Sequence, residues 1–330
     1  MTVRPAVPSG HTRSGGDARA TFALDVQYYL SQDPRQLPSR YLYDALGSCL
    51  FEAICRLPWY PVMRAEARLL AAHRHEVFAL ADPLSRIVEL GPGSGEKVAM
   101  LVGGRNPSAE TLEVHLIDVS PTALTLSTRT LSGLEGIRVV AHEAPYEVGL
   151  TELRDAPQTQ GRTLVLFLGS NIGNFDPPGA DEFLREIRAA LSPGDFLLLG
   201  TDLVKPERVL QLAYDDPLGV TAAFNRNLLV QINRELGGDF DLESFAHRAL
   251  WKPAESRVEM HLVSLRRQVV RVKAAGLELT LEADESIWTE SSYKYHEATV
   301  ALVVERAGFE PVLRWIDAED RFDLTLARAV

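Results

Sequence analysis

The stretch Glu89-Leu90-Gly91-Pro92-Gly93-Ser94-Gly95-Glu96-Lys97 decides the class of fold. It follows a short apolar run over 86–90 and precedes an amphipathic stretch, so it lies where a parallel strand turns into its crossover helix. Glycines at such a turn let the backbone approach a nucleotide closely, and the start of the helix offers free N–H donors. The stretch therefore predicts a nucleotide-binding turn in an α/β fold.

Three acidic residues narrow the class of nucleotide. The dinucleotide fingerprint has glycine or alanine where this chain has Glu96, whose carboxylate would meet a pyrophosphate. Glu89 before the first glycine, and Asp118 at the end of the next predicted strand, suit a cationic nucleoside without phosphates, such as S-adenosylmethionine. Asp118 would accept hydrogen bonds from the ribose hydroxyls. A glycine-rich turn without a ligand is the alternative, and the strand before the turn and Asp118 after it argue against that.

The alternation of short apolar runs with longer amphipathic stretches over 84–203 predicts a doubly wound parallel sheet. Its predicted strands are 86–90, 114–118, 137–141, 163–168 and 196–203, and a helix is predicted over 182–191. The segment 204–290 interrupts this rhythm, with a helix over 221–236 and strands at 257–265 and 269–272. A helix over 296–307 and a hairpin of strands 311–316 and 322–326 then resume the sheet.

A parallel sheet that closes with an antiparallel C-terminal pair resembles the class I S-adenosylmethionine-dependent methyltransferases. We therefore expect an α/β protein with a Rossmann-like methyltransferase sheet and a second, α+β substrate-binding domain. The expected domains are a disordered arm over 1–18, a substrate-binding domain of 19–62 and 204–292, and a cofactor-binding domain of 63–203 and 293–330. The arm is rich in Pro and Gly and has no apolar period.

Composition excludes several classes of function. The 34 basic and 45 acidic side chains give a net charge of −11, which disfavours nucleic acid and anionic membrane surfaces as partners. No apolar run approaches the roughly 20 residues that span a bilayer. Cys49 and Cys55, the only cysteines, fit neither a disulfide framework nor a zinc site, and we expect no metal. We expect a cytoplasmic monomer that acts on a small molecule.

Polar amides follow the fourth predicted strand, within the stretch Phe167-Leu168-Gly169-Ser170-Asn171-Ile172-Gly173-Asn174-Phe175. Ligands of open parallel sheets bind beyond the carboxyl ends of the strands, so these amides are expected to face the cleft. Two asparagines that flank a glycine are also typical of a turn that satisfies its own backbone, which is an open alternative for Asn171 more than for Asn174.

Together with seven other motifs, this stretch closely resembles the L-histidine Nα-methyltransferase family of ergothioneine biosynthesis. The motifs recur in order, with nearly constant spacing, from about residue 22 to the C-terminus. The other seven lie at 40–44, 47–48, 56–58, 64–66, 214–216, 219–225 and 289–294. The resemblance implies an enzyme that transfers three methyl groups from S-adenosylmethionine to the α-amine of L-histidine, giving hercynine.

The resemblance also implies roles for residues on the substrate side. Asn174 and Tyr214 correspond to residues that hold the substrate carboxylate, and Glu290 and Ser292 to residues that hold the imidazole. The remaining correspondences are two tyrosines near the amine, Tyr43 and Tyr60, and a methionine that lines the ring pocket, Met260.

On the cofactor side the family's contacts correspond to the glycine turn with Gly91 and Gly93, to Lys97 and to Asp118. This chain departs from the family where an Asp-Phe pair usually lies over the adenine. Here the sequence is Glu143-Ala144-Pro145-Tyr146-Glu147, so Tyr146 is expected to replace the phenylalanine and Glu143 to supply the acid.

Three other functions compete with this interpretation. An N-methyltransferase that acts on tryptophan or another amino acid is disfavoured by Glu290 and Ser292, because an indole offers one donor and no acceptor. An NAD-dependent dehydrogenase is disfavoured by Glu96 and by the C-terminal hairpin. An inert binding module would keep the fold without turnover. Binding of S-adenosylhomocysteine but not NAD would exclude the dehydrogenase, and turnover would exclude the inert module.

Overall fold

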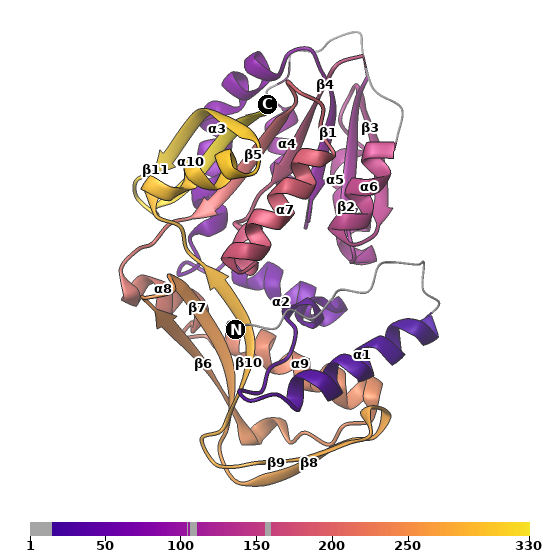
Figure 1. Cartoon of the computed structure of the whole chain (residues 1–330), viewed down its shortest axis with the longest axis vertical. Coiled ribbons are helices and arrows are strands. Elements are labelled where there is room, and N and C mark those ends of the chain that lie inside the picture. Colours follow the sequence, from indigo (N-terminus) through magenta and orange to yellow (C-terminus); the bar gives the residue numbers. More distant parts are fainter. Residues whose placement is uncertain (1–14, 104, 106–110, 156–159) are drawn as a thin grey trace.

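The computed structural model describes residues 15–103, 105, 111–155 and 160–330. A seven-stranded sheet with helices on both faces occupies one end of the molecule, and smaller sheets and helices occupy the other (Figure 1). The strand order of the large sheet is β11-β12-β5-β4-β1-β2-β3. Its strands are β1 (Leu84–Leu90), β2 (Leu112–Asp118), β3 (Ile137–Glu143), β4 (Arg162–Phe167), β5 (Phe196–Asp202), β11 (Phe309–Asp317) and β12 (Phe322–Ala329).

The pairing in this sheet confirms the predicted class I methyltransferase fold. Strands β1 to β5 are parallel where they pair, whereas β12 runs antiparallel to both β5 and β11. Successive side chains of β4 point to opposite faces, so Leu164 and Leu166 pack in one apolar cluster while Val165 and Phe167 pack in the other. A strand buried on both faces needs a continuous apolar run, which explains why the sequence pattern located it.

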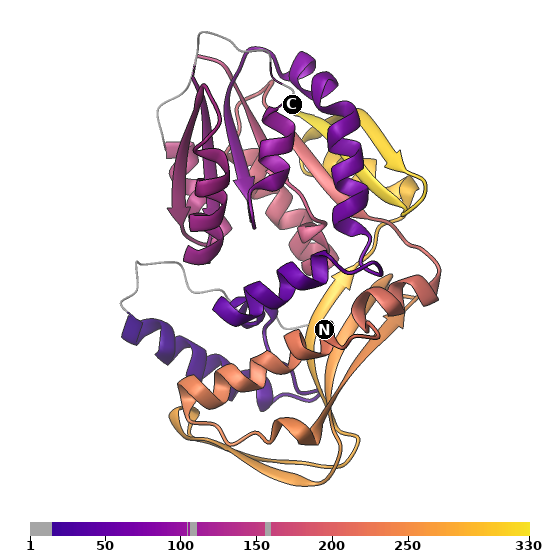
Figure 2. The same cartoon turned by 180° about the vertical axis from the view of Figure 1, so that it is seen from behind.

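Each face of the sheet is covered by helices whose apolar stripes pack on it. One face carries α3 (Val62–Ala81), α4 (Glu96–Val102) and α5 (Pro121–Leu131). The other carries α6 (Tyr146–Asp155), α7 (Pro177–Ala189) and α10 (Glu297–Arg306). In Figure 2, which shows the molecule from behind, the first set of helices lies in front of the sheet.

The second part of the molecule joins the N-terminal segment to the long interruption of the sheet. It contains α1 (Gly15–Leu30), the 3-10 helix η1 (Ser39–Tyr43), α2 (Ala45–Cys55), α8 (Glu207–Tyr214) and α9 (Val220–Leu236). Its three-stranded sheet has the order β10-β7-β6, with β6 (Phe245–Lys252), β7 (Arg257–Ser264) and β10 (Ser286–Tyr293). A separate hairpin pairs β8 (Gln268–Val272) with β9 (Leu277–Leu281). The strands predicted at 257–265 and 269–272 exist, but they lie in different sheets.

The predicted N-terminal arm ends earlier than expected. Residues 1–14 lie outside the described part of the chain, but α1 already begins at Gly15, so residues 15–18 belong to a helix and not to an arm. Helix α1 buries Phe22, Val26 and Leu30 at a spacing of four residues, which places one stripe in the core. Arg19 adds a hydrogen bond from its Nε to the backbone carbonyl of Glu235, 2.7 Å away.

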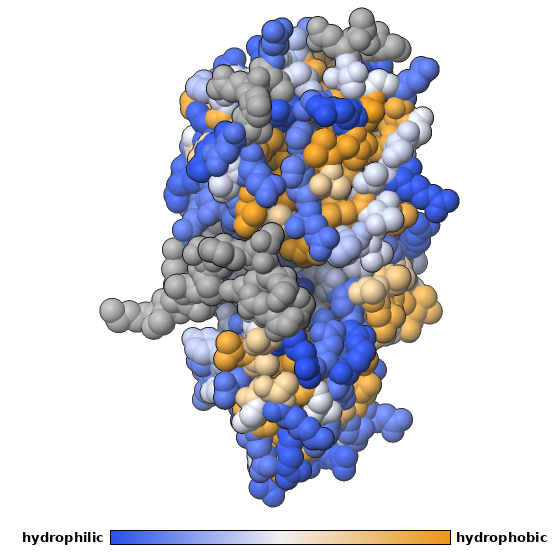
Figure 3. Space-filling model, turned by 90° about the vertical axis from the view of Figure 1, so that its right-hand side faces the viewer, coloured by the Kyte–Doolittle hydropathy of each residue, from blue (hydrophilic) through white to orange (hydrophobic). Residues whose placement is uncertain are grey.

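The surface mixes hydrophilic and hydrophobic residues on the face drawn in Figure 3. Within the described ranges, no helix has the length and apolar character that a bilayer crossing requires.

Candidate active site

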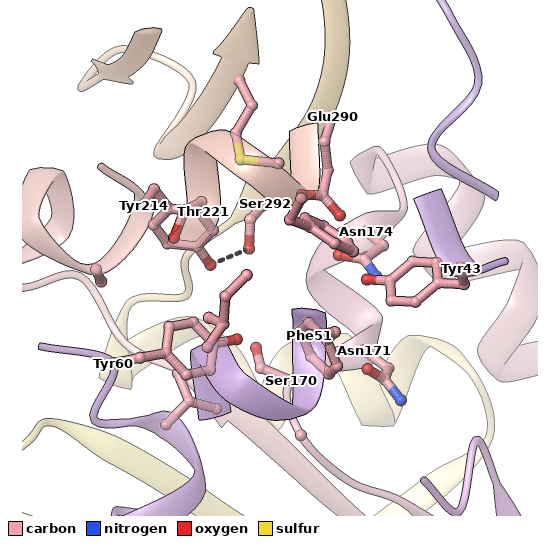
Figure 4. A pocket seen from close by; sticks show the side chains of 16 residues that line it. Tyr43, Phe51, Tyr60, Ser170, Asn171, Asn174, Tyr214, Thr221, Glu290 and Ser292 are labelled. Carbon is pink, nitrogen blue, oxygen red and sulfur yellow. Dashed lines mark hydrogen bonds between the residues drawn. The ribbon is translucent and has the colours of Figure 1, made fainter. Parts of the chain in front are cut away.

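A single cavity brings together all the residues predicted on the substrate side. Its walls come from the N-terminal helices, the turn after β4, helices α8 and α9, and the three-stranded sheet (Figure 4). The predicted residues that line it are Tyr43, Tyr60, Asn174, Tyr214, Met260, Glu290 and Ser292. Six of them are buried or partly buried, whereas Asn174 is exposed. Their roles toward a ligand stay predictions.

Local structure explains why these side chains converge. Glu290 and Ser292 are two residues apart on β10 and so point to the same face, and Met260 is the partner of Glu290 on β7. After β4 the chain passes through Gly169 and Ser170 with φ of 74° and 57°, a left-handed turn that leads into the 3-10 helix η2 (Asn171–Asn174). This turn brings the amides that follow β4 to the cavity.

Glu290 is a buried acid on the cavity wall. Burial raises the pKa of its carboxyl to about 7, although the charge of Lys294 and a hydrogen bond from Tyr43 oppose the shift. A carboxyl with such a pKa is half ionised near neutral pH, and a ligand that donates a hydrogen bond or carries positive charge would favour the ionised form.

Aromatic rings form much of the remaining wall. Tyr43 meets Phe51 and Phe224 edge-on, with 5.5 Å between ring centroids in each pair, and Tyr60 meets Tyr214 at 6.1 Å. Burial raises the pKa of Tyr43 and of Tyr60 well above the usual value of a phenol. Both tyrosines therefore stay neutral at physiological pH and act as hydrogen-bond partners, not as phenolate bases.

A buried lysine that was not among the predicted site residues contacts two of them. The ammonium of Lys294 donates to the hydroxyl of Tyr214 and to Oγ of Ser292, at 2.7 Å each. Tyr214 and Ser292 are themselves joined by a 2.8 Å hydrogen bond. The resemblance assigns these two residues to opposite ends of the substrate, yet they touch. Lys294 directly follows the end of β10, and its spacing of two residues from Ser292 and four from Glu290 in the sequence was the available signal for it.

The glycine turn has the backbone that its sequence predicted. Gly91 and Gly93 have φ of 76° and 54°, and a Cβ on Gly91 would lie 2.6 Å from the hydroxyl of Tyr146. The Tyr146 hydroxyl therefore lies directly against the turn, although Tyr146 itself comes from α6. Only glycine combines that φ with so close an approach.

Two acids at the same edge have capacity for a ligand. Glu89 is 1% exposed at the end of β1, and among the described residues no group donates to its Oε2. Burial raises the pKa of Glu89 to about 8. Asp118, at the end of β2, accepts the backbone N–H of Ser120 at 2.8 Å, and burial raises its pKa. A buried carboxyl oxygen without a donor beside a glycine turn fits a cationic nucleoside that carries hydroxyls and an amino group, because its positive charge would favour the ionised form of Glu89.

Two other predicted cofactor residues, Glu143 and Lys97, lie near the ends of the strands that carry Glu89 and Asp118, and they differ in exposure and in partners. Glu143 ends β3 beside Asp118 and is exposed. Lys97, in the first turn of α4, has its ammonium 2.5 Å from the carboxylate of Glu66. Burial opposes the charge of Lys97, but Glu66 outweighs it and raises the pKa of the ammonium. Glu66 was part of a family motif, but its place beside Lys97 was not predicted.

Known proteins resemble this chain over almost its whole length. A family model described as histidine-specific, SAM-dependent methyltransferase matches residues 22–329. A protein of Mycobacterium tuberculosis (strain CDC 1551 / Oshkosh) named histidine N-alpha-methyltransferase is 41% identical over 304 residues, covering 92% of this chain and 93% of its own. A protein of the same name from Mycolicibacterium smegmatis is 42% identical over 306 residues, with the same coverage. An L-tryptophan methyltransferase from Psilocybe serbica is 25% identical over 324 residues, covering 89% and 88%. The chain therefore belongs to the family of histidine-specific, S-adenosylmethionine-dependent methyltransferases.

Proposed function

We propose that this enzyme transfers three methyl groups in succession from S-adenosylmethionine to the α-amine of L-histidine, giving hercynine for ergothioneine biosynthesis. The observation that carries the proposal is that Asn174, Tyr214, Glu290 and Ser292 line one cavity. The relatives named histidine N-alpha-methyltransferase, at 41% and 42% identity, support the choice of acceptor.

The polar groups of the cavity match the two ends of histidine. A carboxylate accepts hydrogen bonds, which the Asn174 amide and the Tyr214 hydroxyl can donate. A neutral imidazole has one N–H and one bare nitrogen, which suit the acceptor Glu290 and a hydroxyl donor such as Ser292. Contacts at both ends leave the amine as the free group. A side chain without these two nitrogens would leave buried partners unpaired, at a cost of about 1 to 3 kcal/mol each.

The amine subsite must accept growing apolar bulk, because each transfer replaces an N–H with a methyl group. Tyr43 and Tyr60 suit this change, since a neutral hydroxyl can contact the early amine and a ring face attracts the final quaternary cation. Their rings, with Phe51 and Phe224, also limit water in the cavity. Tyr43 and Tyr60 thus contribute by orienting the amine toward the methyl group.

S-adenosylmethionine, when bound, supplies an electrophilic methyl group on a sulfonium. Asp118 would hold the ribose hydroxyls, Gly91 and Gly93 would allow close approach of the backbone, and Tyr146 with Glu143 would lie toward the base. Lys97 is also proposed as a cofactor residue, because it lies in the first turn of the helix that follows the glycine turn. The orphaned oxygen of Glu89 supports a donor-bearing, cationic ligand here.

We also propose the division into a substrate-binding domain of 19–62 and 204–292 and a cofactor-binding domain of 63–203 and 293–330. The separate three-stranded and seven-stranded sheets support this division. A cytoplasmic monomer without nucleic acid or membrane partners is part of the same proposal, and the net charge of −11 supports it.

Mass spectrometry tests the acceptor and the number of methyl groups together. The enzyme is incubated with S-adenosylmethionine and a mixture of all common amino acids. We expect histidine alone to gain one, two and finally three methyl groups. Methylation of tryptophan instead, or a product that stops at one methyl group, would contradict the proposal. Glu290→Ala should raise the KM for histidine strongly and leave binding of S-adenosylhomocysteine nearly unchanged, with the exposed Glu310→Ala as the matched control.

A further inference from the structure

Lys294 is a fully enclosed cation that touches the cavity only through other residues. Its side chain has no measurable exposure, and its ammonium contacts Tyr214, Ser292 and, at 3.1 Å, the carboxylate of Asp202. Three N–H donors meet three acceptors, so the ammonium has no spare donor for a ligand. Burial opposes its charge, but Tyr214 and Asp202 outweigh burial and raise the pKa of Lys294. It is therefore charged at neutral pH.

The charges around Lys294 do not cancel within its cluster. Asp202 also binds the ammonium of Lys205 at 2.6 Å, and both side chains are almost completely buried. Two ammonium groups share the carboxylate of Asp202, and beyond that carboxylate the charge of Lys294 acts on the buried carboxyl of Glu290 across the cavity wall. The Lys294 ammonium, next to the hydroxyls of Tyr214 and Ser292, is therefore only partly neutralised. Such a charge favours ligand groups that accept hydrogen bonds or carry negative charge.

The number of hydrogen atoms that the hydroxyls of Tyr214 and Ser292 can donate explains what Lys294 contributes. Two hydroxyls have two hydrogens, and one of these is used in the 2.8 Å bond between Tyr214 and Ser292. A ligand with two acceptors can break that bond and take both hydrogens. Each oxygen then still accepts an N–H from Lys294 while its own hydrogen bonds to the ligand. Without Lys294 the same rearrangement would leave both buried oxygens accepting no hydrogen bond.

We propose that Lys294 is a positioning residue that holds the hydroxyls of Tyr214 and Ser292 as hydrogen-bond donors toward the amino-acid substrate. This inference rests on the proposed function, in which Tyr214 meets the carboxylate and Ser292 meets the imidazole. It follows that the ring nitrogen at Ser292 is bare and that the bound imidazole is neutral. A ring that presents an N–H at this position is rejected, because a donor would face a donor.

The test compares Lys294→Gln and Lys294→Met with Lys205→Met. Both lysines are buried against Asp202, but of the two only Lys294 bonds to the hydroxyls, so Lys205→Met is the matched control. Dissociation constants for L-histidine and for S-adenosylhomocysteine are measured by calorimetry. We expect Lys294→Met to weaken histidine binding roughly ten- to hundredfold, and S-adenosylhomocysteine binding by less than about threefold. Lys294→Gln keeps an N–H donor and should recover part of the loss.

A double-mutant cycle separates orientation from support of the fold. In a Ser292→Ala background, Lys294→Gln should weaken histidine binding less than it does in the wild type, because one of the two hydroxyls is gone. Equal losses in both backgrounds, or an equal loss of histidine affinity in Lys205→Met, would overturn the inference. A wild-type enzyme that does not bind histidine would instead contradict the proposed function itself. If Lys294→Met does not fold, the Gln variant and the cycle still decide.

Discussion

Glu66 and Gly169 are joined by a bifurcated hydrogen bond, in which the N–H of Gly169 lies 2.8 and 2.9 Å from the two oxygens of a fully buried carboxylate. The same carboxylate binds Lys97 at 2.5 Å. Glu66 thus connects the first helical turn after the glycine stretch to the turn that carries Asn171 and Asn174. The proposed cofactor and substrate sites share this one support.

Loss of Glu66 should damage both sites. Glu66→Ala leaves the partly buried ammonium of Lys97 without its partner, which should cost more than about 1 kcal/mol of unfolding free energy but less than the about 3 to 5 kcal/mol of a fully buried pair. Because Gly169 loses its acceptor too, affinity for S-adenosylhomocysteine and for histidine should both fall. Denaturant unfolding and calorimetry measure these effects. Glu76→Ala, on the exposed side of the same helix, should cost less than about 1 kcal/mol. Equal losses in the two variants would refute the shared support.

Glu290 should make stability depend on pH. Its folded pKa of about 7 lies above the ordinary value of 4.5 for a glutamate, so between these pH values the folded state binds the proton more tightly. Stability from this group is therefore fully present below about pH 4.5 and is lost as pH rises through the folded pKa of about 7, by about 3 kcal/mol in all. Glu290→Gln should remove this slope and gain stability relative to wild type at pH 8. Unfolding curves from pH 5 to 8 measure it. Glu89 shifts in the same direction in both proteins, so the difference isolates Glu290. Parallel wild-type and variant curves would contradict the assignment.

Asp118 should control affinity for the cofactor but not for histidine. Asp118→Ala removes the carboxylate proposed to accept the ribose hydroxyls, and loss of hydrogen bonds to a charged group costs about 1.5 to 3 kcal/mol. We expect the Kd for S-adenosylhomocysteine to rise about ten- to hundredfold. Asp118→Asn keeps one carbonyl acceptor for Ser120 and should lose less. Unchanged Kd in the alanine variant would remove the ribose assignment.

Gly91 should tolerate no side chain. Gly91→Ala places a Cβ 2.6 Å from the Tyr146 hydroxyl at a φ of 76°, which strains the turn by about 1 to 3 kcal/mol. Both stability and S-adenosylhomocysteine affinity should fall. Adding Tyr146→Phe relieves the contact but not the backbone strain, so it should restore only part of the loss. Gly133→Ala is the control, because a Cβ there meets nothing within 4 Å. Equal behaviour of the Gly91 and Gly133 variants would show that the close approach is unimportant.

Local patterns predicted the elements whose burial is continuous. The strands β4 and β5 were predictable because burial on both faces requires a continuous apolar run. The glycines after β1 were recognisable because a positive φ favours glycine at single positions. The antiparallel strands were harder to predict. The strand β10 alternates buried and partly buried residues and carries Glu290. A glutamate in a strand is usually exposed, yet Glu290 is only 9% exposed.

The α/β sheet, the glycine turn and, through the motifs, the residues that line the proposed substrate site were all predictable from the order of the residues. The contacts of Glu66 with Lys97 and Gly169, and that of Lys294 with Tyr214, became visible only in the folded molecule. These partners lie far apart along the chain. Apolar periodicity records how one segment packs, whereas a buried polar pair forms only when two distant segments fold together, and either partner alone resembles an ordinary surface residue.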